Sequence, residues 1–78
     1  ITVQGNVSLN QKLNVKKLPV KFKTVDGYFD ISNNGLTSLE GCPKEVGNDF
    51  YCYKCKRKFI KEEFESLCKV KKKILVQH

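Results

Sequence analysis

A repeat with a period of about 20 residues constrains the fold of this 78-residue chain more than any other feature. The apolar pairs that recur are Val7 and Leu9, Phe29 and Ile31, and Phe50 and Cys52, and Val25 recurs as Val46. A unit of this length cannot bury its apolar side alone, so successive units must stack and cover one another. The repeat therefore predicts a short solenoid of about three turns.

Each unit predicts a short strand followed by a corner. Phe29 and Ile31 occupy alternate positions, which places one side of a strand in the core and the other side in solvent. Asn34 is expected to hydrogen-bond neighbouring backbone inside the bend, because its amide offers both a donor and an acceptor. Leu36 and Leu39 then fill the interior, and strands of successive units are expected to pair in parallel.

The run FDISNNGLTSLEGCP resembles the leucine-rich repeat, in which the asparagine position also accepts cysteine, the residue type at Cys55 of the third unit. More narrowly, NNGLTSLEGCPKEVGNDFYC, followed by a basic tail ending in CKVKKKILV, is similar to small leucine-rich-repeat-like proteins of large tailed bacteriophages. The resemblance spans residues 5–76. It implies an architecture, a viral origin and a place in the host cytoplasm, more than a function.

The expected architecture is a single α/β domain over residues 1–78. Residues 1–25 form an irregular N-terminal cap repeat with Lys12 at the asparagine position, residues 26–58 form the regular repeats, and residues 59–78 form a helical cap and a short strand at 73–76. Arg57 stands where the middle unit has Leu36, which predicts that the solenoid ends there. The expected core is Val7, Leu9, Phe29, Ile31, Leu36, Leu39, Phe50, Cys52, Phe59, Phe64 and Leu67. The helix is expected to present Ile60, Phe64, Leu67 and Cys68 on one face as a lid.

Catalysis finds little support in the sequence. His78 is the only histidine and is the last residue, the adjacent Glu62 and Glu63 would point apart on a helix, and no glycine-rich phosphate loop is present. We therefore expect neither an enzyme nor a cofactor.

The four cysteines form one CxxC pair, Cys52 and Cys55, and two isolated residues, Cys42 and Cys68. Because structural zinc sites use two close couples, this spacing favours reduced, structural cysteines over a metal site or disulfides.

No apolar run approaches the roughly 20 residues that span a bilayer, so no membrane association is expected. The start at Ile1 favours an excised domain or a processed product.

A binding face is better supported. Between the core positions, the strands are expected to direct outward Asn6, Ser8 and Asn10 in unit one, Tyr28, Asp30 and Ser32 in unit two, and Asp49, Tyr51 and Tyr53 in unit three. All three tyrosines of the chain fall on this side. Tyrosine is favoured in protein recognition, which makes Tyr28, Tyr51 and Tyr53, with Asp30 and Asp49, the candidate contacts for a host or phage protein. Packing of neighbouring strands by the tyrosines is the alternative.

The charge distribution supports a second hypothesis. The formal net charge is +7, with five lysines and no acid in residues 1–25, one lysine against five acids in 26–53, and nine basic residues against three glutamates in 54–78. The candidate phosphate contacts are Lys54, Lys56, Arg57, Lys58, Lys71, Lys72 and Lys73. Because nearly all of the basic residues are lysine, such binding to RNA or DNA would be non-specific and salt-dependent. The alternative is a solvated lysine surface, and the sequence leaves the oligomeric state open.

Overall fold

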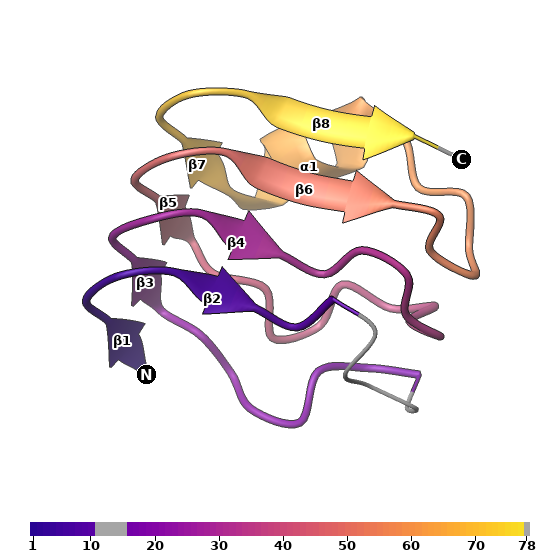
Figure 1. Ribbon diagram of the computed structural model, residues 1–78, viewed down its shortest axis with the longest axis horizontal. Coiled ribbons are helices and arrows are strands. Elements are labelled where there is room, and N and C mark those ends of the chain that lie inside the picture. The colour runs from indigo at the N-terminus through magenta and orange to yellow at the C-terminus, as the bar shows by residue number, and fades with distance from the viewer. Residues whose placement is uncertain (11–15, 78) are drawn as a thin grey trace.

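The computed structural model describes residues 1–10 and 16–77, which form a small β-solenoid of about three turns with parallel strands and one short helix near the C-terminus (Figure 1). Lys12 and His78, on which the sequence carried predictions, lie outside the described residues. The two ends of the chain lie at opposite ends of the stack (Figure 1). The described parts of the two basic segments, residues 1–10 with 16–25 and residues 54–77, therefore flank the acidic middle segment in space as well as in sequence.

Two four-stranded parallel sheets run along the stack. The first sheet contains β1 (Thr2–Val3), β3 (Thr24–Val25), β5 (Glu45–Val46) and β7 (Lys69–Val70). The second sheet contains β2 (Val7–Ser8), β4 (Phe29–Asp30), β6 (Phe50–Tyr53) and β8 (Ile74–Gln77). The chain passes through each sheet once per turn, so the four strands of a sheet are separated by three full turns.

The strand register confirms the repeat. Phe29 pairs with Val7 on one side and with Phe50 on the other, as the recurrence of these positions in the sequence predicts. Val25 pairs with Val46 in the first sheet, again at matching positions of two successive units. The sequence did not predict this sheet as strands, because each of its two-residue strands is too short to show alternation.

The stack continues beyond Arg57, where the sequence placed its end. β7 pairs with β5 and β8 pairs with β6, so each sheet gains a fourth strand after the helix. Lys69 and Val70 extend the register of Glu45 and Val46, and Ile74 extends that of Phe50. The loss of a leucine at one corner is therefore compatible with continued pairing, because the ladder hydrogen bonds depend on the backbone rather than on that side chain.

The core lies between the two sheets and consists of stacked aromatic and aliphatic side chains. The rings of Phe29 and Phe50 lie 5.3 Å apart, and Phe64 packs on Phe50 at 4.7 Å between ring centroids. The expected core residues that are buried are Val7, Phe29, Ile31, Leu36, Phe50, Cys52, Phe59 and Phe64, while Leu9 and Leu39 pack partly buried against them. Burial of these side chains confirms the predicted interior, with one exception in the helix.

The helix α1 spans Lys61–Leu67 and buries only Phe64. Ile60 and Leu67 are each 52% exposed, so the prediction that both join the apolar face of a lid is wrong. Ile60 lies before the first turn in extended backbone, where its N–H donates to Oε2 of Glu63 at 3.0 Å. Among the described residues, no helix has the length and apolar character needed to cross a bilayer.

Candidate protein-binding face

The outward side of the second sheet carries the five residues that the sequence nominates for partner binding. We call this set the tyrosine face: Tyr28, Asp30, Asp49, Tyr51 and Tyr53, all of them half-buried. They flank the inward Phe29 and Phe50, because successive side chains of a strand point to opposite sides. The rings of Tyr28 and Tyr51 meet edge to face at 5.8 Å, and those of Tyr51 and Tyr53 lie 6.1 Å apart. The three rings thus form one continuous aromatic patch.

Asp49 holds the centre of this patch in place. The hydroxyl of Tyr51 donates a hydrogen bond to Oδ2 of Asp49 at 3.1 Å, and the backbone N–H of Lys73 donates to Oδ1 at 2.9 Å. The bond to Asp49 is the main reason that the pKa of Tyr51 lies above its ordinary value of 10.0, and partial desolvation adds to it. Among the described residues, the hydroxyls of Tyr28 and Tyr53 have no hydrogen-bond partner.

Asp30 and Ser32 mark the edge of the tyrosine face. Oδ1 of Asp30 accepts the N–H of Ser32 at 2.8 Å, which turns the chain as β4 ends. Ser32 is 1% exposed and its Oγ accepts the N–H of Tyr53 at 2.8 Å, so its predicted outward position is wrong. The reason is that β4 is only two residues long, and the alternation of the strand does not extend to Ser32.

The first unit contributes polar side chains beside the tyrosine face. Oδ1 of Asn6 accepts the N–H of Tyr28 at 3.0 Å, and Nδ2 of Asn10 lies 3.5 Å from Oδ2 of Asp30. Ser8 is exposed on β2. Asn6 and Asp49 therefore make the same kind of contact. In each case a side-chain oxygen accepts a backbone N–H of the following turn.

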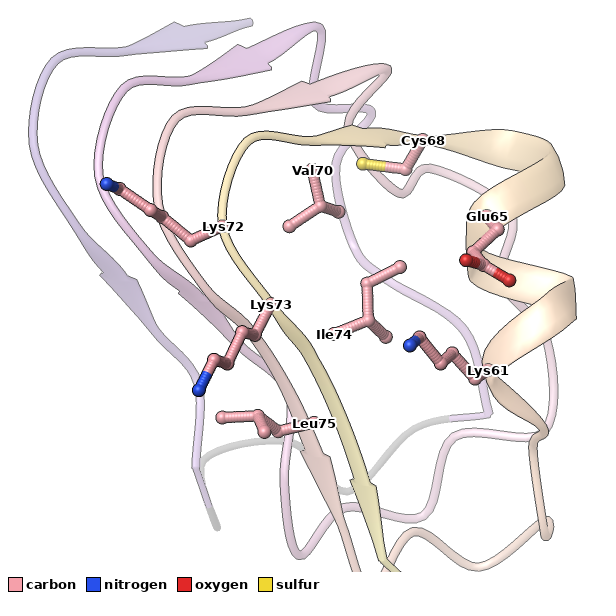
Figure 2. A pocket seen from close by; sticks show the side chains of 8 residues that line it. All are labelled: Lys61, Glu65, Cys68, Val70, Lys72, Lys73, Ile74 and Leu75. Atoms are coloured by element: carbon pink, nitrogen blue, oxygen red, sulfur yellow. The ribbon is translucent and has the colours of Figure 1, made fainter.

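Leu75 and Lys73 extend the tyrosine face, although the sequence did not nominate them for it. Leu75 pairs with Tyr51 in the register of β6 and β8, and Gln77 pairs with Tyr53. Figure 2 shows that Lys73 and Leu75 point to the outside of this turn, whereas Ile74 points inside. The signal that would have found Leu75 is the continuation of the repeat past the helix, where ILVQ takes the positions that FYCY holds in the third unit.

The candidate phosphate contacts lie in two exposed segments of the last turns. Lys54, Lys56, Arg57 and Lys58 follow β6, and Lys71, Lys72 and Lys73 form the turn between β7 and β8; all seven are exposed. The guanidinium of Arg57 is already engaged, because it pairs with Oε1 of Glu63 at 2.7 Å and lies 4.7 Å from the ring centroid of Phe59. The lysines therefore provide the available positive charge of these segments.

A hollow of about 570 Å³ opens at the last turn (Figure 2). Its lining combines basic and apolar side chains, namely Lys61, Glu65, Cys68, Val70, Lys72, Lys73, Ile74 and Leu75. Val70 and Ile74 would be covered by a further turn if the stack continued, which explains why they are only half-buried. The hollow thus lies on the open side of the last described turn and is lined in part by side chains that pack against the core.

The cysteines are free thiols in the structure. Burial raises the pKa of Cys42 to about 12 and that of Cys68 to about 11, so both are neutral at physiological pH. Among the described residues, no group of three or more histidine, cysteine, aspartate or glutamate side chains could hold a metal ion.

Comparison with known proteins finds no family model, no curated protein and no solved structure that matches this chain.

Proposed function

We propose that this chain is a non-enzymatic protein-binding module, leucine-rich-repeat-like and phage-encoded, that docks a host or phage protein in the host cytoplasm through its tyrosine face. The repeat-like character is supported by Asn34, which is buried at the corner and donates from Nδ2 to the carbonyls of Leu9 at 2.7 Å and Ile31 at 2.9 Å. Hydrogen bonds to backbone inside the bend are what the sequence predicts for Asn34.

The observation that carries the proposal is the aromatic patch of Tyr28, Tyr51 and Tyr53. Each ring is half-buried, so its orientation is set by neighbours before a partner arrives, and little rotamer entropy remains to be lost on binding. In this proposal, the hydroxyls of Tyr28 and Tyr53 form hydrogen bonds with the partner at the rim of the interface. Asp30 and Asp49 add negative charge to this patch on a chain that is otherwise basic, which favours a partner surface with apolar and basic character.

Affinity capture from infected-cell lysate tests the proposal, with and without nuclease treatment. Three tagged chains are compared: the wild type, a variant with Tyr28, Tyr51 and Tyr53 replaced by alanine, and a matched variant with Lys71, Lys72 and Lys73 replaced by alanine. A discrete protein that survives nuclease, is retained by the lysine variant and is lost from the tyrosine variant is the expected result. Circular dichroism of both variants checks that the fold is intact. A protein still captured by the folded tyrosine variant would contradict the assignment of the face.

Non-specific binding to RNA or DNA is the second candidate, favoured by the exposed lysines of residues 54–58 and 71–73. Contacts to several phosphates would make the affinity fall steeply as salt rises, since the logarithm of the binding constant falls by about 0.7 to 0.9 per phosphate for each tenfold increase in salt. Fluorescence anisotropy with a single-stranded RNA and a duplex DNA, at two salt concentrations, measures this slope. A steep slope that the triple lysine variant reduces, with no effect of the tyrosine variant, would favour this candidate over the first.

A further inference from the structure

The thiols of Cys52 and Cys55 are in close contact at the corner of the third unit. Their Sγ atoms are 2.8 Å apart. Cys52 is 2% exposed and points inward from β6, and Lys54, between the two cysteines, adopts a positive φ of 55° where the chain bends. This turn returns Cys55 to the sulfur of Cys52. A disulfide has an S–S bond of about 2.05 Å, so the two sulfurs need to approach by less than about 1 Å to form one.

The two thiols differ in their surroundings. Cys55 is half-buried, and its Sγ also lies 3.3 Å from the carbonyl oxygen of Ile31. The hydrogen bond from Cys52 lowers the pKa of Cys55, and the same bond together with burial raises the pKa of Cys52. The nearby Asp30 opposes ionisation of both thiols. Cys55 is therefore the thiol that ionises first and the one that can attack, because the thiolate is the nucleophile.

The other two cysteines provide an internal contrast. Cys68 is buried, Cys42 is half-buried, and desolvation raises the pKa of each. Neither has a sulfur atom at hydrogen-bond distance among the described residues. A general oxidation of the chain would not distinguish the four cysteines, whereas the geometry singles out one pair.

We propose that Cys52 and Cys55 form a thiol–disulfide exchange site that is oxidised reversibly by low-molecular-mass disulfides. The Cys55 thiolate attacks one sulfur of the disulfide, which releases one thiolate and leaves a mixed disulfide on Cys55. Cys52 then gives its proton to the thiolate released in the first step and attacks Sγ of Cys55, which releases the second thiolate. Two protein thiols become one protein disulfide as one small disulfide becomes two thiols, and excess thiol reverses both steps.

Glutathione redox buffers at pH 7.5 test the proposal on the full reduced chain. After equilibration, free thiols are blocked by alkylation under native and unfolding conditions, and peptides are mapped by mass spectrometry. The expected result is loss of two thiols, both from the Cys52–Cys55 peptide, with Cys42 and Cys68 still alkylated after unfolding and full recovery of thiols with reduced glutathione. Absence of an intramolecular disulfide, or a disulfide between any other pair, would overturn the proposal.

Two substitutions separate the steps. Cys52→Ser keeps a hydroxyl donor beside Cys55 and removes the resolving thiol, so this variant is expected to retain one glutathione on Cys55. Cys55→Ser is expected to resist modification, because the remaining Cys52 thiol is buried and hard to ionise. Cys68→Ser serves as the matched control and is expected to oxidise like the wild type. A variant Cys52→Ser that takes up no glutathione while remaining folded would contradict Cys55 as the attacking group.

Discussion

Asn34 and Cys55 donate hydrogen bonds to the same acceptor, the carbonyl oxygen of Ile31. Nδ2 of Asn34 lies 2.9 Å from this oxygen and Sγ of Cys55 lies 3.3 Å from it. Asn34 also reaches down to the carbonyl of Leu9 at 2.7 Å, so consecutive corner side chains connect three successive turns. A cysteine can follow an asparagine at this corner because one donor toward the turn below is sufficient to satisfy a buried carbonyl.

The shared carbonyl predicts coupling between the two corner residues. Asn34→Ala leaves the carbonyl of Leu9 without its donor and is expected to lower the free energy of unfolding by about 1–3 kcal/mol. Cys55→Ala alone costs less, because Ile31 keeps its bond from Asn34. The double variant is expected to exceed the sum of the two by about 1 kcal/mol, since only then does the carbonyl of Ile31 lose both donors.

Urea unfolding followed by far-ultraviolet circular dichroism measures these differences. Asn48→Ala is the matched control, because Asn48 is exposed and is expected to change stability by less than about 0.5 kcal/mol. Strict additivity of the two corner substitutions would show that the carbonyl of Ile31 does not connect them.

The helix predicts a contrast between two of its apolar residues. Phe64 is 1% exposed and its ring contacts those of Phe50 at 4.7 Å and Phe59 at 5.7 Å, so Phe64→Ala is expected to cost about 3–5 kcal/mol. Leu67 is 52% exposed, and Leu67→Ala is expected to cost less than about 0.5 kcal/mol. Thermal and urea unfolding of the two variants measure this difference. Equal losses would mean that Leu67 packs on the same apolar face as Phe64, as the sequence predicted.

Most of the fold could be predicted from the repeat in the sequence. Pairs such as Phe29 and Phe50 occupy matching core positions, and the interior of a stacked repeat dictates apolar residues at matching positions. The first sheet escaped prediction because a two-residue strand such as Thr24–Val25 has only one inward side chain and no period to detect. Leu67 was misplaced because helical periodicity marks a face and does not state which residues of that face the rest of the chain covers.

The tyrosine face was predictable in its strands and not at its ends. Tyr51 and Tyr53 follow directly from alternation along β6, which is four residues long. Ser32 turned inward because β4 ends at Asp30, a boundary that local side-chain hydrogen bonds decide. Leu75 lies on the face because β8 pairs with β6, and the sequence prediction missed it because that prediction ended the repeat at Arg57. Cys52 and Cys55 lie close together because the backbone turns at Lys54. A lysine does not indicate a positive φ, so the sequence did not predict this short distance between the two sulfur atoms.

Gly47 lies at a close approach between two successive turns, where a side chain would not fit. A Cβ atom added there would lie 2.0 Å from the backbone oxygen of Asp26 in the turn below, which no side-chain rotation could relieve. Its own N–H donates to the carbonyl of Val25 at 2.8 Å, so the backbone cannot move away without losing that bond. Gly47→Ala is expected to destabilise the chain by about 1–3 kcal/mol, measured by urea unfolding. An unchanged unfolding midpoint would mean that these two turns can move apart far enough to accommodate the added Cβ atom without loss of stability.

The start of the helix predicts a dependence of stability on acid. The N–H of Ile60, followed by the side chain of Arg57, lowers the pKa of Glu63 below its ordinary value of 4.5. A carboxylate with a lowered pKa contributes stability that is present above pH 4.5 and is lost as the pH falls through the pKa of the folded state. Glu63→Gln is therefore expected to flatten the acid limb of the stability curve.

Unfolding midpoints between pH 7 and pH 2 measure the effect of Glu63. The matched control is Glu65→Gln, an exposed glutamate on the same helix, which is expected to leave the acid limb unchanged. If both variants flatten the curve to the same extent, general charge repulsion rather than the bonds of Glu63 causes the acid sensitivity.

Tyr51 predicts the opposite dependence, at alkaline pH. Its hydrogen bond to Asp49 at 3.1 Å raises the phenol pKa above 10.0, so the neutral ring is favoured in the folded chain. This contribution to stability is fully present below pH 10.0 and is lost as the pH rises through the pKa of the folded state. In an NMR titration that follows the ring Cζ of each tyrosine, Asp49→Ala is expected to move the Tyr51 midpoint down toward 10.0, whereas Asp30→Ala is expected to move it much less. A Tyr51 midpoint that ignores Asp49 would mean that the hydroxyl is not held by that carboxylate, and the centre of the tyrosine face would then be free to rotate before a partner binds.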